Sequence, residues 1–277
     1  MQLSVVIITF NEEANIRRTL ASVQSLVADG KGEIVVVDSG STDRTVEIAK
    51  SLGANVYIEQ WKGYAAQKNS AIDKATGDWI LSLDADEEVD RELINELTGT
   101  STTGSASNEW CLTTQGSDDI RKGDPIGFRI RRKNCFLGRW IKHGGLWPDP
   151  KLRLFRRGAG RFEDRLVHED IRADGPTQLI PAGTLIHHSY PTLSDYIEHM
   201  NRYSSLGAEM VVAKGKVGFN LLNIVLRPIL TFIYNYFFRL GFLDGREGLL
   251  LHLYHAVYVS WKYAKAWELS RSKTVSS

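Results

Sequence analysis

The first ninety residues alternate between short apolar runs and longer amphipathic stretches. LSVVIITF (residues 3–10) and EIVVVDSG (33–40) are rich in β-branched residues and lack polar alternation, which is typical of strands buried on both faces of a parallel sheet. Between them, residues 12–26 carry apolar side chains at helical spacing. This pattern predicts a strand, an amphipathic helix and a second strand.

The same order continues along the chain. A helical pattern over residues 41–54, which ends near Gly53, is followed by a third apolar run at 55–60. Residues 63–77 form another helical pattern and lead into DWILSLD (78–84). Such alternation predicts an α/β fold with a doubly wound, mostly parallel sheet, whose ligand site lies at the carboxyl ends of the strands.

Polar residues fall at three of these predicted strand ends. Thr9 and Asn11 follow the first strand, Asp38 ends the second, and Asp84 ends the fourth. Each alone fits ordinary turn or helix-cap chemistry. Together they predict one shared site at the carboxyl edge of the sheet.

The acidic stretch that starts at Asp84 is interpreted in two parts. The first strand is followed by neither Gly-x-Gly-x-x-Gly nor Gly-x-x-x-x-Gly-Lys-Ser/Thr, so another group must neutralise a phosphate. A divalent cation held by Asp84 and Asp86 meets that need, because Mg²⁺ and Mn²⁺ use one or two protein carboxylates together with substrate phosphates. We predict that Glu87, Glu88 and Asp90 instead begin the next helix, where acids suit the positive end of the helix dipole.

Composition limits the class of protein and its surroundings. The 277 residues, 43% of them hydrophobic, suit one large α/β domain with appended elements. A formal charge of +1 gives no general attraction to nucleic acid. Cys111 and Cys135, the only cysteines, provide neither a thiolate metal site nor a disulfide framework, and the N-terminus lacks the order of a signal peptide. We therefore expect a cytoplasmic protein.

Four motifs in order resemble a known family. VVIITFNEEANI, VVVDSGSTDRT, GYAAQKNSAI and GDWILSLDADEEV are similar to the inverting nucleotide-sugar glycosyltransferases of family 2, which have the GT-A fold. The segment from residue 128 to 171 resembles the branch that includes the lipopolysaccharide inner-core β-1,4-glucosyltransferase, which adds glucose to a heptose. That branch also contains enzymes with other donors and acceptors.

The resemblance implies a nucleotide-sugar site formed by Thr9, Phe10, Asn11, Glu12, Asp38, Lys68 and Asp84. Within it, Asp38 would accept a hydrogen bond from the base or ribose, and Lys68 would approach the diphosphate. Asp86 would bind Mg²⁺ or Mn²⁺ directly, whereas Asp84 would serve the ribose or a metal-bound water. Many relatives have Tyr where this chain has Phe10, which keeps a stacking face without the hydroxyl. For residues 67–69 the alternative is an exposed helix turn.

An inverting transfer also needs a base for the acceptor hydroxyl. Within FEDRLVHED (162–170) we predict Glu169 as this base, because relatives place an acid in a comparable segment and His168 beside it can orient the carboxylate. Asp170 is an alternative base, and a solvated turn with ion-paired arginines is the alternative for the whole cluster. His187, which follows an apolar run, is a candidate further metal ligand, although a packed or hydrogen-bonded histidine is commoner.

Between residues 128 and 161, eleven lysines and arginines accompany a single acid, Asp149. This run predicts an anion site for a phosphorylated or carboxylated glycan or for lipid headgroups. Nucleic acid is an alternative, because Trp140 and Trp147 interleave with the basic residues. The neutral overall charge and the donor-site motifs argue against nucleic acid.

The C-terminal region is rich in aromatic and aliphatic residues. Residues 217–245 are interrupted by Arg227, Pro228 and Arg239, and residues 248–267 by His and Lys. A spanning helix needs roughly 20 predominantly apolar residues, so we predict a helical hairpin that lies in the membrane interface. A homo-oligomer interface or a helical lid on the sheet is the alternative.

We therefore predict a GT-A domain at 1–205, with a nucleotide-sugar half at 1–97 and an acceptor half at 125–205, and a helical region at 206–277. The expected reaction moves glucose from UDP-glucose to a heptose of the lipopolysaccharide core, at the cytoplasmic face of the bacterial inner membrane. Transfer to a polyprenyl-linked glycan or polyprenyl phosphate is one alternative, and a non-catalytic sugar-nucleotide-binding module is another. The donor sugar, the acceptor hydroxyl and the oligomeric state stay open.

Overall fold

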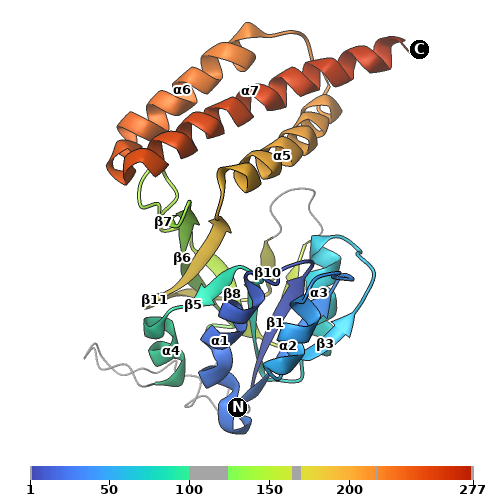
Figure 1. The fold of residues 1–277 in the computed structure, drawn as a ribbon, viewed down its shortest axis with the longest axis vertical. Coiled ribbons are helices and arrows are strands. Elements are labelled where there is room, and N and C mark those ends of the chain that lie inside the picture. The colour runs from blue at the N-terminus through green and yellow to red at the C-terminus, as the bar shows by residue number, and fades with distance from the viewer. Residues whose placement is uncertain (1, 100–123, 164–169, 216, 276–277) are drawn as a thin grey trace. The chain divides into compact units, whose positions relative to one another are not determined.

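The computed structural model describes residues 2–99, 124–163, 170–215 and 217–275 (Figure 1). The chain divides into two compact units. The sheet unit comprises residues 1–132 and 149–187, and the helical unit comprises residues 133–148 and 188–277. The predicted boundary at residue 205 falls within helix α5 (Leu193–Ala213).

The first four strands are parallel. They are β1 (Leu3–Thr9), β2 (Gly32–Asp38), β3 (Asn55–Ile58) and β4 (Trp79–Asp84). Their spatial order is β3-β2-β1-β4, and the register sets Thr9 beside Asp38 and Ile8 beside Asp84. The polar strand ends therefore lie at one edge of the sheet, and the four predicted strands are confirmed.

Later strands join this sheet through antiparallel pairs, so the prediction of a mostly parallel sheet holds only for its N-terminal half. β8 (Lys151–Arg156) runs antiparallel to both β4 and β6 (Gly127–Phe136), and β5 (Glu87–Val89) pairs antiparallel with β11 (Thr177–Tyr190). Antiparallel neighbours need no helical crossover. The alternation of helical and strand patterns, which is typical of parallel strands, accordingly stops at β4.

Among the described residues the sheet has nine strands, in the order β3-β2-β1-β4-β8-β6-β11-β5, with β7 (Arg139–Trp140) paired to β6. β9 (Gly160–Phe162) and β10 (Ile171–Ala173) form a separate antiparallel pair. The result is a mixed α/β unit.

Helices cover both faces of the parallel strands. The apolar sides of α1 (Ile16–Val27), α2 (Thr45–Ser51) and α4 (Arg91–Thr98) share one buried cluster. The side chains of α3 (Tyr64–Lys74) belong to a second cluster. Successive residues of β1 alternate between the two clusters, which explains why that strand is apolar at every position from Val5 to Ile7. Full burial of each such side chain contributes about 1.5–3 kcal/mol.

The helical unit contains α5, α6 (Arg227–Ile233) and α7 (Gly245–Val275). The π-helical turns η2 (Leu222–Leu226) and η3 (Tyr234–Phe238) extend α6 at both ends, and the 3₁₀ turn η4 (Gly241–Asp244) leads into α7. Both α5 and α6 pack on α7 (Figure 1). In the described part of the chain, no helix combines the length and the apolar character needed to cross a membrane.

Candidate active site

The chain order changes direction beside β1, which lies between β2 and β4. This is the switch point at which open α/β sheets bind ligands. The Oγ1 of Thr9 donates a hydrogen bond to Oδ2 of Asp38 at 2.9 Å, and Oδ1 of Asp38 accepts from the N–H groups of Gly40 and Ser41. Asp38 is fully buried. Its carboxylate thus shapes the turn after β2, and its role toward a base or ribose stays a prediction.

The residues that follow β1 connect the first two strand ends. Asn11 adopts φ 55°, in the left-handed region that Asn tolerates, and its Oδ1 accepts the N–H of Thr42 at 2.9 Å. The N–H of Glu12 donates to Oγ1 of Thr45 at 2.7 Å. The Phe10 side chain is 56% exposed, so its ring is accessible to a stacking partner.

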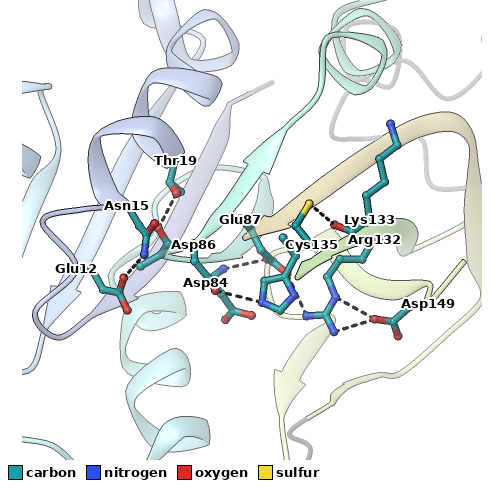
Figure 2. A network of polar contacts seen from close by, with 12 residues as sticks. Glu12, Asn15, Thr19, Asp84, Asp86, Glu87, Arg132, Lys133, Cys135 and Asp149 are labelled. Atoms are coloured by element: carbon teal, nitrogen blue, oxygen red, sulfur yellow. Dashed lines mark hydrogen bonds and ion pairs between the residues drawn. The ribbon is translucent and has the colours of Figure 1, made fainter. Parts of the chain in front are cut away.

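Three carboxylates come together at this edge. Burial raises the pKa of Glu12, the hydrogen bond from Asn15 opposes that effect, and the nearby Asp86 and Asp84 raise the pKa further. Figure 2 shows Glu12 and Asn15 on one side of Asp84 and Asp86, with Glu87 beyond them. The structure therefore brings together acids that follow β1 and β4, which are the residues that the family resemblance assigns to the nucleotide sugar and the metal.

Asp84 is held by two cations. Its Oδ1 lies 2.7 Å from Nζ of Lys68 and its Oδ2 lies 2.6 Å from a guanidinium nitrogen of Arg153. Burial alone would raise the pKa of Asp84, but Arg153 and Lys68 hold it well below its usual range. Both carboxylate oxygens are fixed.

Helix α3 supplies Lys68 from a buried position. Lys68 is 8% exposed and Gln67 is fully buried, so the alternative of an exposed helix turn is wrong for both. The side chain of Asn69 donates to the backbone carbonyl of Phe162 and accepts from its N–H, at 2.9 and 3.0 Å. These contacts connect α3 to the strand that precedes the segment of the predicted base.

Glu87 and Glu88 do not begin a helix. Both belong to β5, which pairs with β11, and Glu87 is fully buried. A Glu87 oxygen lies 2.7 Å from Arg153 and 3.4 Å from Arg132, and the other accepts the N–H of Asp84 at 3.0 Å. Asp90 is the N-cap of α4, as predicted.

The basic run between residues 128 and 161 is largely committed to internal partners. Arg132 pairs with Asp149 at 2.8 Å (Figure 2), and Arg161 pairs with Asp73 at 2.5 Å. Arg131 donates to the backbone carbonyls of residues 180 and 181. Much of the charge that suggested an anion site therefore stabilises the strands β6 and β8.

Asp86 is paired with His187. Oδ2 of Asp86 lies 3.2 Å from Nε2 of His187, and the two side chains are 23% and 17% exposed. Burial opposes ionisation of Asp86, but the neighbouring His187 leaves its pKa below the ordinary value. The Asp86 carboxylate is a suitable ligand for Mn²⁺ or Mg²⁺, which prefer oxygen, whereas an imidazole such as that of His187 is a ligand more typical of softer transition metals.

No group of three or more His, Cys, Asp or Glu side chains with metal-holding geometry occurs among the described residues. A metal at Asp86 and His187 would therefore complete its coordination with substrate oxygens and water. This is the open type of site that Mg²⁺ commonly occupies beside phosphates. The residues present fit such an ion.

The predicted base, Glu169, lies outside the described residues. On either side of it, Phe162 pairs with Ile171, and the N–H of Glu163 donates to the carbonyl of Asp170 at 3.2 Å. Asp170 itself is exposed. The contacts of β9 and β10 thus hold the two ends of this segment together.

A parallel half-sheet with Asp84 and Asp86 at its switch point, joined to an antiparallel half, is consistent with the GT-A fold of nucleotide-sugar transferases. The sequence model described as glycosyl transferase family 2 matches residues 4–159, more than half of the chain. The chain belongs to this family, and the resemblance seen in its motifs is confirmed.

Two relatives are similar over nearly their whole length. The lipopolysaccharide core biosynthesis glycosyltransferase LpsC of Rhizobium meliloti (strain 1021) is 30% identical and aligns with 97% of this chain and 93% of its own. The uncharacterized glycosyltransferase RC0292 of Rickettsia conorii (strain Malish 7) is 45% identical over 90% of this chain and 84% of its own. Among solved structures, residues 1–349 of S. aureus TarS with UDP-GlcNAc align at a TM-score of 0.44 and 16% identity, covering 99% of this chain and 92% of that one.

Proposed function

We propose that this glycosyltransferase moves glucose from UDP-glucose to a heptose of the lipopolysaccharide core. The observation that carries the proposal is the Asp86–His187 pair beside the fixed carboxylate of Asp84, at the switch point of the sheet. The similarity to LpsC over 97% of the chain supports the acceptor class. A cytosolic donor and a lipid-linked acceptor together favour the cytoplasmic face of the bacterial inner membrane.

The residues at this edge bind different parts of the nucleotide-sugar donor. Asp84, fixed by Lys68 and Arg153, presents a stationary carboxylate to the ribose hydroxyls. The exposed ring of Phe10 offers a stacking face to the base. Asp86 and His187 would hold Mg²⁺ or Mn²⁺, which supplies positive charge next to the departing diphosphate.

The transfer is a single displacement with inversion. The acceptor oxygen forms a bond to the anomeric carbon while the bond from that carbon to the diphosphate oxygen breaks, and the hydroxyl proton passes to a carboxylate. Glu169 is the proposed base, with Asp170 as the alternative. Either lies in or beside the segment whose ends are joined through Phe162 and Ile171.

The reaction is tested with purified protein, a panel of nucleotide sugars, and truncated lipopolysaccharide that ends in heptose. With Mg²⁺ or Mn²⁺ present, we expect the mass of one hexose to be added from UDP-glucose. Addition only to polyprenyl acceptors would replace the acceptor assignment. Nucleotide binding without transfer to any acceptor would indicate the non-catalytic module.

The metal role is tested with Asp86→Asn and His187→Ala. We expect each variant to lose about 10²-fold or more in turnover, the magnitude typical of a group that stabilises developing charge. Glu88→Gln is the matched control, because Glu88 lies two residues from Asp86 and pairs at 3.8 Å with Arg18. Full activity of Asp86→Asn would refute the assignment.

A further inference from the structure

One helix of the helical unit exposes a long apolar face. From η2 through α6 to η3 the chain is continuously helical, and pairs of exposed large apolar side chains recur every four residues, from Leu221 and Leu222 to Phe237 and Phe238. A repeat of four drifts around an ordinary helix of 3.6 residues per turn. The two π-helical turns contain more residues per turn, so the pairs stay on one side.

The opposite side of this helix is firmly packed. Pro228 is buried, Oγ of Ser260 on α7 donates to the carbonyl of Ile224 at 2.8 Å, and Arg227 donates to the Tyr263 hydroxyl at 2.6 Å. Figure 1 shows α6 lying along α7. Among the described residues, this helix packs mainly on α7 and also contacts η4. The exposed pairs between residues 221 and 238, which form the apolar face, remain accessible.

Along the chain, the charged residues within and on either side of this face have one sign up to Asp244. Residues 210–243 contain two lysines and two arginines and neither Asp nor Glu. Over the whole helical unit, 13 lysines and arginines accompany 6 aspartates and glutamates, whereas the sheet unit has 21 against 27. The helical unit thus carries a formal charge of +7 and the sheet unit −6.

These observations favour an anionic surface as the partner. A second copy, related by a two-fold axis, would set the same cationic face against itself. A bilayer with anionic headgroups matches both the apolar side chains and the positive charge. Arg239, stacked over the ring of Tyr234 at 5.0 Å, places a cation beside an aromatic ring, as is common at membrane interfaces.

We propose that residues 221–238 dock on an anionic lipid bilayer, with the helix in the plane of the interface. The apolar pairs enter the boundary between headgroups and acyl chains, while Arg227 and Arg239 remain at headgroup level. This inference identifies the face by which the proposed enzyme contacts the membrane. It does not depend on which sugar is transferred or on the acceptor.

The test is flotation of the full-length protein with vesicles of phosphatidylethanolamine and phosphatidylglycerol. We expect the protein to float with these vesicles, and we expect vesicles of phosphatidylcholine alone to bind at least tenfold more weakly. The variant Leu230→Glu/Phe238→Glu replaces two side chains that are 54% and 75% exposed. It should keep the circular dichroism spectrum and melting temperature and lose at least tenfold in partition coefficient.

The matched control is Ile58→Glu/Leu179→Glu, which changes two exposed apolar residues of the sheet unit. We expect this control to bind vesicles like the unmodified protein. Failure of the unmodified protein to bind anionic vesicles at low salt would overturn the proposal, and so would equal losses in both variants. A discrete dimer that Leu230→Glu/Phe238→Glu dissociates, without any vesicle binding, would show that the face binds a second copy. Because flotation involves no glycosyl transfer, it can fail while the proposed reaction stands.

Discussion

Glu87 provides a sharp test of the buried charge network. In the structure its carboxylate contacts two arginines and accepts the N–H of Asp84, and it is fully buried. If the residue lay in the first turn of an exposed helix, as the sequence suggested, replacing it would change the stability by no more than about 0.5 kcal/mol. We expect a much larger effect from Glu87→Ala.

The magnitude follows from the groups that the substitution leaves behind. The guanidinium of Arg153, 6% exposed, keeps only Asp84 as an ion-pair partner among the contacts described here. Breaking a buried ion pair by removing one partner costs about 3–5 kcal/mol, and an unsatisfied backbone N–H costs about 1–3 kcal/mol. These costs overlap, so we expect Glu87→Ala to lower the free energy of unfolding by about 3–5 kcal/mol. Glu87→Gln keeps an acceptor and should cost about 1–3 kcal/mol.

Guanidinium chloride unfolding, followed by tryptophan fluorescence and circular dichroism, measures the difference. Glu88→Ala is the control, because the neighbouring Glu88 is 32% exposed and its pair with Arg18 is long, at 3.8 Å. We expect less than about 1 kcal/mol for this control. A loss below 1 kcal/mol for Glu87→Ala, or equal losses for both variants, would refute the reasoning.

Three further predictions concern packing, titration and capping. The Cβ added in Gly183→Ala would meet the backbone of Leu93, so thermal melting should show a free energy of unfolding lower by about 1–3 kcal/mol. Gly218→Ala, which has open space around its Cβ, should leave the stability unchanged. Burial lowers the pKa of His252 to about 4. Between pH 6.5 and 4 the unfolded chain therefore binds more protons than the folded chain. The free energy of unfolding should fall by up to about 3 kcal/mol as the pH falls through this window. His252→Gln should reduce this dependence of stability on pH. Asp90→Ala removes the N-cap of α4 and should cost about 1–2 kcal/mol in denaturant unfolding; no loss would contradict the cap.

The sequence predicted the parallel half of the fold well because its signals are local. Unbroken β-branched runs and helical periodicity mark β1 to β4 and α1 to α3 within short windows, and strand ends follow directly from strand positions. The strand ends at Thr9, Asp38 and Asp84 converge through the parallel order alone, whereas Glu12 was named through the family resemblance. That part of the candidate site was therefore accessible without coordinates.

The antiparallel half and the ion-pair network were missed because they depend on distant pairings. Arg153 reaches Asp84 across 69 positions of sequence, through the pairing of β8 with β4. Glu87 looked like part of a helix start because four of the five residues from 86 to 90 are acidic, whereas the pairing of β5 with β11 decides its environment. His187 carried a weak local signal, an apolar run before a histidine, and only the fold places it beside Asp86.

The network also explains why two aspartates of one short motif can have different roles. Each oxygen of Asp84 already faces a cation, so a divalent ion placed against it would meet Lys68 and Arg153 at close range. Asp86 faces His187 rather than a lysine or arginine, and an imidazole can itself serve as a metal ligand. Under the proposed function, a metal would therefore gain more at Asp86 than at Asp84, and Asp84 would serve as an acceptor for hydroxyl groups. The arginine and lysine fixed on one carboxylate would thereby direct a metal to the other.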